Sequence, residues 1–452
     1  MSKEKNMNKY LTAPRSSTKM PKGIPYIIGN ELAERFSFYG MKTILIVFMT
    51  QYLIDSDGQL DVLSNQDATS WYHTFTFAVY LTPLIGAIIS DIFLGKYKTI
   101  LLLSIVYCLG HFTLAIDETR LGLMYGLTLI SIGAGGIKSC VSAHVGDQFG
   151  KSNSHLLEKV FGWFYLSINL GAAASTMLTP ILLKLYGPSI AFGVPGLLMF
   201  IATVLFWAGR NVFIHIPPSG KDFVNEIKKK ENIAGIIQLL PVYIFIMIFW
   251  ALFDQTGSTW VLQAKDLNRH WLGINWLESQ VQAVNPIMIL ILVPLLSYYI
   301  YPWLKTKFDL TPLRKISIGL FLAVPSFLII GYLQYQIELG FKPSIAWQVF
   351  AYAILTTSEV FVSITCLEFS YTQAPNSMKS IVMGIFMVSI AFGNIFTTIF
   401  NKIMPASFIV ADKYTASYFI FYAALMLCTA VFFLPILKYF KPKTYLHKEE
   451  VA

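Results

Sequence analysis

Residues 414–440, YTASYFIFYAALMLCTAVFFLPILKYF, carry no charged side chain before Lys438 and are long enough to cross a bilayer as one helix. Similar segments recur throughout the 452 residues, which are 55% hydrophobic and only 13% charged, with a mean hydropathy of +0.58. An average soluble domain has about 25% charged residues, so this chain carries too little charge to cover a water-facing surface. The composition therefore predicts an all-α polytopic membrane protein. It excludes a soluble α/β enzyme, a coiled coil, collagen and a disordered chain as the main architecture.

Apolar segments of this length predict twelve transmembrane helices in two six-helix bundles. The most polar internal stretch, residues 213–232, separates the sixth span from the seventh and is predicted to be a cytoplasmic linker. The predicted division is a tail at 1–23, a bundle at 24–212, the linker at 213–232, a bundle at 233–440 and a tail at 441–452. The predicted spans are 24–53, 69–93, 97–116, 121–144, 156–186, 190–212, 233–263, 278–303, 311–337, 345–372, 378–402 and 414–440.

The distribution of positive charge predicts the orientation. Most of the 34 lysine and arginine residues lie in the two tails and in the loops on the same side of the membrane. Because positive charge marks the cytoplasmic side, both termini are predicted to be cytoplasmic. The cluster Lys228, Lys229 and Lys230 then fits a loop beside anionic lipid and not a nucleic-acid site. Residues 1–22 are polar and basic without a short apolar core, so we expect no cleavable signal peptide.

The first predicted span contains four ionisable residues, Glu31, Glu34, Arg35 and Lys42. A charge at the centre of a membrane costs at least about 2.5–3.5 kcal/mol, so such residues usually face a polar cavity or one another. Glu31 and Arg35 are four residues apart and share a helical face with Lys42. An ion-pair network that only holds neighbouring helices together is the alternative. Four such groups on one span exceed what packing needs, so we expect them to serve a polar interior.

Further ionisable residues are predicted to lie in other spans. Lys138 lies among glycines that permit close helix packing, and Glu359 and Glu368 lie in the tenth span. His73 carries an imidazole, which changes charge near physiological pH, although a lone histidine in a helix is more often only a hydrogen-bonding residue. Cations in one half and an anion in the other suit a zwitterionic substrate, and carboxylates with a histidine suit a proton relay. The pattern indicates a proton-coupled carrier.

Several motifs resemble those of the proton-coupled oligopeptide transporter family. Residues 31–40, ELAERFSFYG, resemble its ExxERFxYYG signature, and residues 164–171, FYLSINLG, resemble its FYxxINxG motif. Residues 367–375, LEFSYTQAP, resemble FSYSQAP, and residues 251–260, ALFDQTGSTW, resemble a further family block. Residues 86–96, GAIISDIFLGK, resemble the loop signature of the wider major facilitator superfamily. The runs YHTF and VYLTP near His73 and GGIKSC around Lys138 are most similar to the animal-type members. The resemblance implies the major facilitator fold.

The resemblance also implies roles for the matched residues. Arg35 and Lys138 would receive the C-terminal carboxylate of a peptide, and a guanidinium suits a carboxylate better than an ammonium does. Glu368 would hold the N-terminal amine and would pair with Lys138 when the site is empty. The other substrate-binding residues that the resemblance implies are Tyr39, Tyr80 and Asn169 for the peptide backbone and Trp260 for a side-chain pocket. The proton-coupling residues that it implies are Glu31, Glu34, Arg35 and His73.

The sequence departs from the family pattern at several positions. Phe38 replaces the first tyrosine of the signature, so the hydroxyl of that tyrosine is lost. Gln263 and Ala264 occupy the region where many bacterial members have an acidic residue, which favours His73 as the protonation site. The same change leaves Lys42 without its usual partner, and Asp266 is the substitute that we expect. The short linker has no room for the two extra helices of many bacterial members.

The predicted function is import of di- and tripeptides by a proton-coupled symporter that works by alternating access. Another small solute on the same scaffold, such as nitrate or an amino acid, is the alternative. An enzyme is not expected, because the sequence lacks HExxH and GxSxG and its histidines are scattered. Four separated cysteines without CxxC spacing predict neither disulfides nor a metal site. We expect no cofactor apart from protons, a multi-pass location in the cell membrane, contact with lipid, no nucleic-acid partner, and function as a monomer.

Overall fold

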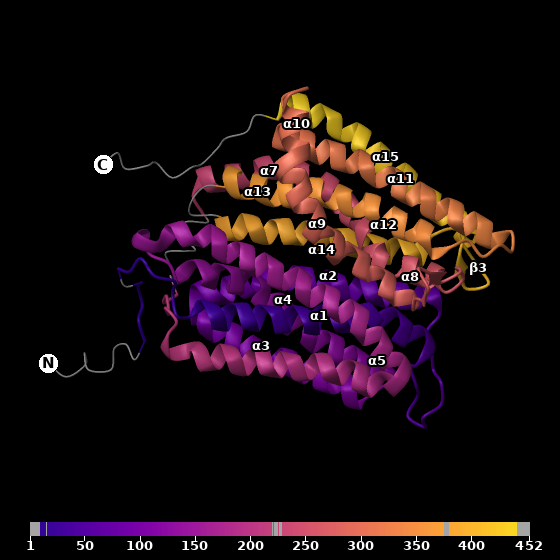
Figure 1. Ribbon diagram of the computed structural model, residues 1–452, viewed down its shortest axis with the longest axis horizontal. Helices are drawn as coiled ribbons and strands as arrows, with labels where there is room; N and C mark the ends of the chain where they lie inside the picture. The colour runs from indigo at the N-terminus through magenta and orange to yellow at the C-terminus, as the bar shows by residue number, and fades with distance from the viewer. Residues whose placement is uncertain are drawn as a thin grey trace.

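The computed structural model describes residues 10–14, 16–218, 220, 225, 228–374 and 379–440 (Figure 1). The long elements of the described part are all helices, joined by loops, and two short antiparallel hairpins are the named strand pairs. The first pairs β1 (His270–Trp271) with β2 (Ile274–Asn275), and the second pairs β3 (Ile409–Val410) with β4 (Lys413–Tyr414). The predicted tails and linker lie partly outside the described residues, as does Pro375 of the FSYSQAP-like motif.

Residues 24–212 form the first group of helices, called here the N-terminal half. Their long helices are α1 (Ile24–Gln51), α2 (Asn65–Ile89), α3 (Lys96–Ile116), α4 (Arg120–Asp147) and α5 (Leu157–Ala208). A wide turn, Ser90–Leu94, extends α2. α5 consists of two consecutive helices separated by a kink, because Gly187 adopts a φ of +80° and Pro188 follows it. A residue with a side chain rarely adopts this φ, so the glycine allows the chain to turn between the fifth and sixth predicted spans.

Residues 230–440 form the second group, called here the C-terminal half. Two of its predicted spans are interrupted by wide helical turns, Leu296–Ile300 between α9 and α10 and Val360–Ile364 between α12 and α13. A short 3-10 turn, Asp254–Gly257, separates α7 from α8. The helices are α7 (Lys230–Phe253), α8 (Thr259–Ala264), α9 (Val284–Leu295), α10 (Tyr301–Lys305), α11 (Pro312–Glu338), α12 (Ile345–Glu359), α13 (Thr365–Gln373), α14 (Lys379–Ile403) and α15 (Ala416–Tyr439).

Ten helical segments in the described part are long and apolar enough to cross a membrane. α1, with its four ionisable residues, is not among the ten, and the two helices of α5 count once, as Lys159–Asn211. The prediction of an all-helical, multi-pass membrane protein is therefore confirmed. The count of twelve spans and the side on which the termini lie stay predictions.

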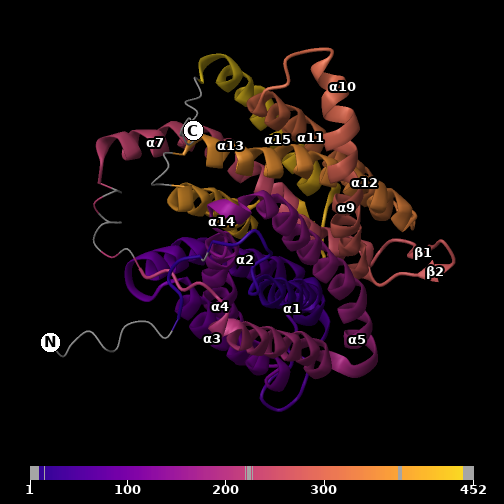
Figure 2. The same ribbon diagram turned by 60° about the vertical axis from the view of Figure 1, so that its left-hand side comes forward.

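The two halves lie side by side as two layers of helices, the first indigo to magenta and the second rose pink to yellow (Figures 1 and 2). They pack against each other mainly through α2 with α14 and α5 with α9. Within the N-terminal half, α2 and α4 come close enough for backbone contact. A Cβ added at Gly86 would lie 2.1 Å from the carbonyl oxygen of Gly136. This confirms that the glycines before Lys138 serve close helix packing.

Candidate functional site

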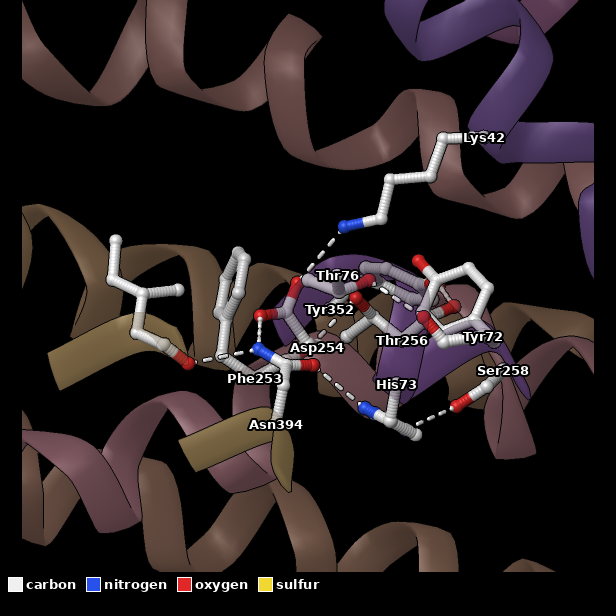
Figure 3. A network of polar contacts seen from close by, with 11 residues as sticks. Lys42, Tyr72, His73, Thr76, Phe253, Asp254, Thr256, Ser258, Tyr352 and Asn394 are labelled. Atoms are coloured by element: carbon white, nitrogen blue, oxygen red, sulfur yellow. Dashed lines mark hydrogen bonds and ion pairs between the residues drawn. The ribbon is translucent and has the colours of Figure 1, made fainter. Parts of the chain in front are cut away.

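A chain of buried polar side chains joins the two halves (Figure 3). Lys42 on α1 forms an ion pair with Asp254, with 3.1 Å between Nζ and Oδ1. The other oxygen of Asp254 accepts a 2.7 Å hydrogen bond from Nδ2 of Asn394 on α14. Oδ1 of Asn394 lies 2.7 Å from Nδ1 of His73 on α2, and Nε2 of His73 lies 2.9 Å from Oγ of Ser258. We call these five residues the inter-half network.

The partners of His73 define its tautomer. The carboxylate of Asp254 only accepts hydrogen bonds, so the amide nitrogen of Asn394 faces Asp254 and the amide oxygen faces His73. Nδ1 of His73 therefore donates to Asn394, and Nε2 accepts from the hydroxyl of Ser258. Both ring nitrogens are satisfied, and the side chain has no exposed surface. The neutral imidazole thus fits the network, and a second proton would require Ser258 to change from donor to acceptor.

The local backbone places Asp254 and Ser258 at the junction. The chain leaves α7 at Asp254, turns through Gly257 and starts α8 at Thr259. A Cβ added at Gly257 would lie 1.9 Å from the hydroxyl of Tyr72 on α2, so a larger residue here would displace the Tyr72 side chain. The helix break therefore turns the polar side chains of this segment toward the N-terminal half.

The prediction that Asp266 pairs with Lys42 is wrong. Asp266 pairs instead with Lys413 in the second hairpin, at 2.8 Å. A buried ammonium needs a buried anion, and Asp266 lies beyond the end of α8 where its partner is largely exposed. The signal for the correct partner was present in the sequence, because Asp254 is the only charged residue in the predicted span 233–263. Asn394 and Ser258 were missed because uncharged polar residues are common in membrane helices.

The first span brings together Glu31, Glu34 and Arg35, as its pattern predicted. Nε of Arg35 lies 2.6 Å from Glu31 and 3.2 Å from Glu34. Glu31 and Glu34 are buried, and Arg35 keeps 11% of its side chain exposed. Within the described part of the chain, neither carboxylate oxygen of Glu34 accepts a hydrogen bond of good geometry. This carboxylate is thus less well satisfied than that of Glu31.

Lys138 lies between two aromatic rings. Its ammonium is 4.0 Å from the ring centre of Phe38 and 4.3 Å from that of Tyr80. Each ring face attracts a cation, and Phe38 therefore contributes to the site although it lacks the hydroxyl of the family signature. The ion pair between Lys138 and Glu368 that we expected for an empty site does not form among the described residues.

Glu368 lies apart from these cations, exposed on α13. It lines a pocket of about 210 Å³ together with Tyr301, Lys305 and Lys315. The arrangement therefore keeps Glu368 on the C-terminal half and Lys138 on the N-terminal half without direct contact.

The remaining predicted residues are distributed unevenly. Tyr39 is half-buried beside Phe38, with 5.4 Å between ring centres. Nδ2 of Asn169 donates to the carbonyl of Tyr165 in its own helix, at 3.0 Å. Trp260 has no exposed surface. The rings that enclose Trp260 belong to Phe327 and Tyr352 of the same half. Its role in a substrate pocket stays a prediction.

All hydrogen bonds that join the described residues of the two halves lie toward one end of the molecule, called here the closed end. It is the end at which α1 finishes and α2 begins. Burial lowers the pKa of Lys265, which donates to Thr50 at 2.8 Å across the junction. Further bonds at this end join Asn65 to Asp412, Gln66 to Asn401, Gln51 to Glu278, Gln280 to Met177 and Gln282 to Thr43.

The described residues contain no group of histidine, cysteine and acidic side chains that could hold a metal ion. The described residues form two helical halves that are joined toward one end by buried polar and charged side chains. The protein is thus a multi-pass membrane protein with a fold like that of the major facilitator superfamily. The chain belongs to the POT family, whose model matches residues 97–236 and 222–416.

Known proteins agree with this assignment. Peptide transporter family 1 of Drosophila melanogaster is 38% identical over 365 residues, which are 70% of this chain and 48% of that protein. Solute carrier family 15 member 2 of Homo sapiens is 36% identical over 371 residues, covering 70% of this chain and 49% of that protein. The chain thus spans about half the length of the curated relatives it matches.

Two crystal structures have a similar fold over nearly their whole length. The in meso structure of the POT family transporter PepTSo has a TM-score of 0.85 at 33% identity, covering 93% of this chain and 99% of that one. An auto-inhibited POT family peptide transporter also has a TM-score of 0.85, at 30% identity, covering 95% and 99%.

Proposed function

We propose that this chain is a proton-coupled symporter that imports di- and tripeptides by alternating access. The proposal includes twelve spans, bundles at 24–212 and 233–440, cytoplasmic termini and a location in the cell membrane. The observation that carries it is the inter-half network, because a carrier that opens alternately to two sides needs contacts between its halves that can break. Membership of the POT family supports the substrate class, since the relatives named above are peptide transporters.

In the proposed orientation the closed end faces the outside, and the chain is in its inward-facing state. Opening to the outside then requires the network and the other bonds of the closed end to separate. His73 is well suited to control this step, because its neutral form satisfies both Asn394 and Ser258. A proton that arrives from outside adds charge beside Lys42 and reverses one of these bonds. Protonation of His73 therefore favours the outward-open state.

After closure, the proton passes toward Glu34 and Glu31, which already pair with Arg35. A protonated carboxylate releases Arg35 to bind the peptide carboxylate together with Lys138. Glu368 receives the peptide amine, and Tyr39, Tyr80, Asn169 and Trp260 complete the site as the resemblance implies. Loss of the proton to the cytoplasm restores the ion pairs and expels the peptide. The membrane potential adds to the driving force about 2.3 kcal/mol for each positive charge that moves inward across 100 mV.

Replacing Arg35 by lysine is expected to lower dipeptide uptake by about tenfold or more. The planar guanidinium can donate two parallel hydrogen bonds to a peptide carboxylate, and an ammonium cannot. Both ion pairs of Arg35 in the described structure use Nε, which leaves its terminal nitrogens for a carboxylate. One ammonium cannot serve the two glutamates and a peptide together. Uptake of labelled dialanine measures the effect, with the exposed Arg120→Lys as control. Uptake of R35K equal to that of R120K would contradict the proposed role.

A disulfide between positions 65 and 412 is expected to abolish uptake reversibly. The backbone N–H of Asn65 donates to the carboxylate of Asp412 at 2.9 Å, so these residues meet across the closed end. Asn65→Cys and Asp412→Cys would be combined with Cys428→Ser, because Cys428 is an exposed cysteine. Oxidation should stop transport, dithiothreitol should restore it, and each single cysteine should be insensitive. Continued transport by the fully oxidised protein would show that this end need not open.

Proteoliposomes test the proposed function itself. Labelled dialanine should accumulate against its gradient when the outside is acidic, and a protonophore should prevent this. Accumulation that does not depend on the proton gradient would contradict the proposed proton coupling. Failure to transport any di- or tripeptide would contradict the proposed substrate class.

A further inference from the structure

The pocket beside Glu368 contains more charge than a single amine requires. Its volume is about 210 Å³, and its polar lining residues are Ser297, Tyr301, Lys305, Lys315, Thr365 and Glu368. Lys305 ends α10, Lys315 lies in the first turn of α11, and Glu368 lies on α13. Three segments therefore bring one anion and two cations to the same cavity.

These opposite charges face one cavity without pairing. No ion pair within 4.0 Å connects Glu368 with Lys305 or Lys315, all three of which are described. Lys315 lies instead over the ring of Tyr301, 4.3 Å from its centre. Neither lysine has another acidic partner in the described part of the chain. The space between the charges is thus open to a ligand that supplies a positive group to Glu368 and a negative group to the lysines.

We propose that this pocket binds the side chain of the first residue of the peptide and selects an acidic one, aspartate or glutamate. The inference rests on the proposed function, in which Glu368 holds the peptide amine. The first side chain branches from the carbon that bears this amine, so it lies within reach of the same cavity. Lysine ammoniums pair with a carboxylate as point charges without a fixed geometry. The carboxyl carbon of aspartate or glutamate lies two or three bonds from Cα, and a side chain of this length fits the volume of the pocket.

The charge balance separates this ligand from others. Two lysines and one glutamate give the empty pocket a net charge of +1. Once the peptide amine has neutralised Glu368, the two lysines leave a charge of +2, which one side-chain carboxylate lowers again to +1. A doubly charged phosphate would be repelled by the carboxylate of Glu368. A basic first side chain would meet two cations and should bind worst.

Competition during dipeptide counterflow, without a pH gradient or membrane potential, tests the proposal. Unlabelled Glu-Ala and Gln-Ala compete with labelled dialanine, and they differ in charge but hardly in shape. Glu-Ala should compete about fivefold more strongly than Gln-Ala, because a solvent-exposed ion pair contributes a binding free energy of about this size. The same pair in reverse order, Ala-Glu against Ala-Gln, should show no such preference. The readout is the ratio of the two inhibitory concentrations, which a general loss of activity does not change.

Two lysine variants assign the effect to the pocket. Lys315→Gln and Lys305→Gln, alone and together, should bring the Glu-Ala preference down to equality. Lys307→Gln should retain the Glu-Ala preference, because Lys307 is exposed between α10 and α11 but does not line the pocket. Equal competition in the unaltered protein, or a preference that survives in the double variant, would overturn the proposal while dialanine counterflow continues. If no dipeptide exchanges at all, the proposed function fails and this inference fails with it.

Discussion

Replacing His73 by glutamine is expected to abolish proton-driven accumulation of dipeptide while peptide exchange without a gradient continues. Glutamine can still donate toward Asn394 and accept from Ser258, the two bonds that His73 makes at 2.7 and 2.9 Å. It cannot take up a proton. A difference of one pH unit provides about tenfold accumulation for each coupled proton, and the variant should lose this factor. Uptake and counterflow of labelled dialanine in the same proteoliposomes measure the two activities.

The control is His270→Gln in the first hairpin, an exposed histidine whose side chain contacts Asn275 of the same hairpin and does not belong to the network. It should keep both activities. Full gradient-driven accumulation by H73Q would rule out His73 as a coupling residue and direct attention to Glu31 and Glu34. Loss of counterflow as well would indicate that His73 only holds the halves together.

Replacing Asp254 by alanine is expected to produce the largest loss of stability among the variants considered. The ammonium of Lys42 would remain buried without a counter-ion, since the paired side chains are only 10% and 8% exposed. Breaking a buried ion pair in this way costs about 3–5 kcal/mol. Removing Lys42 as well, in K42A/D254A, should recover most of the loss because no unpaired charge remains. Thermal unfolding of D254A, K42A and K42A/D254A in detergent measures the three losses and yields the coupling energy.

The exposed pair Arg120–Asp61 provides the matched control, with side chains that are 51% and 38% exposed. Alanine at either position should change stability by less than about 1 kcal/mol, because water screens the charges. Asp254 would lose its assigned role if D254A were no less stable than D61A. The double variant should remain unable to couple transport to protons, because Asn394 then lacks the anion that orients it.

The multi-pass helical architecture could be predicted because hydropathy is local. A helix in lipid satisfies its backbone N–H and C=O groups by hydrogen bonds within the segment, so a long apolar run predicts a helix without reference to distant residues. The interruptions were not predictable in this way. The wide turns at Leu296–Ile300 and Val360–Ile364 lie inside apolar sequence that reads as continuous helix. Their positions depend on packing against neighbouring helices.

The site was predictable where its partners are close in sequence. Glu31 and Arg35 are four residues apart on one helix, and their contact followed from that spacing. The partner of Lys42 lies more than two hundred positions away, and the choice between Asp254 and Asp266 depended on their depth in the fold. Glu368 and Lys138 belong to different halves, so their separation depends on the conformation of the carrier and not on the sequence alone.

The distance between the halves at the closed end tests the central claim most directly. Spin labels at Leu60→Cys and Leu272→Cys, in a Cys428→Ser background, lie on opposite halves at positions that are 71% and 72% exposed. Double electron–electron resonance in nanodiscs should show one distance between the labels at neutral pH. A second, longer distance should become more populated on acidification, except in H73Q. A single distance that ignores pH and peptide would contradict an account in which this end opens when His73 is protonated.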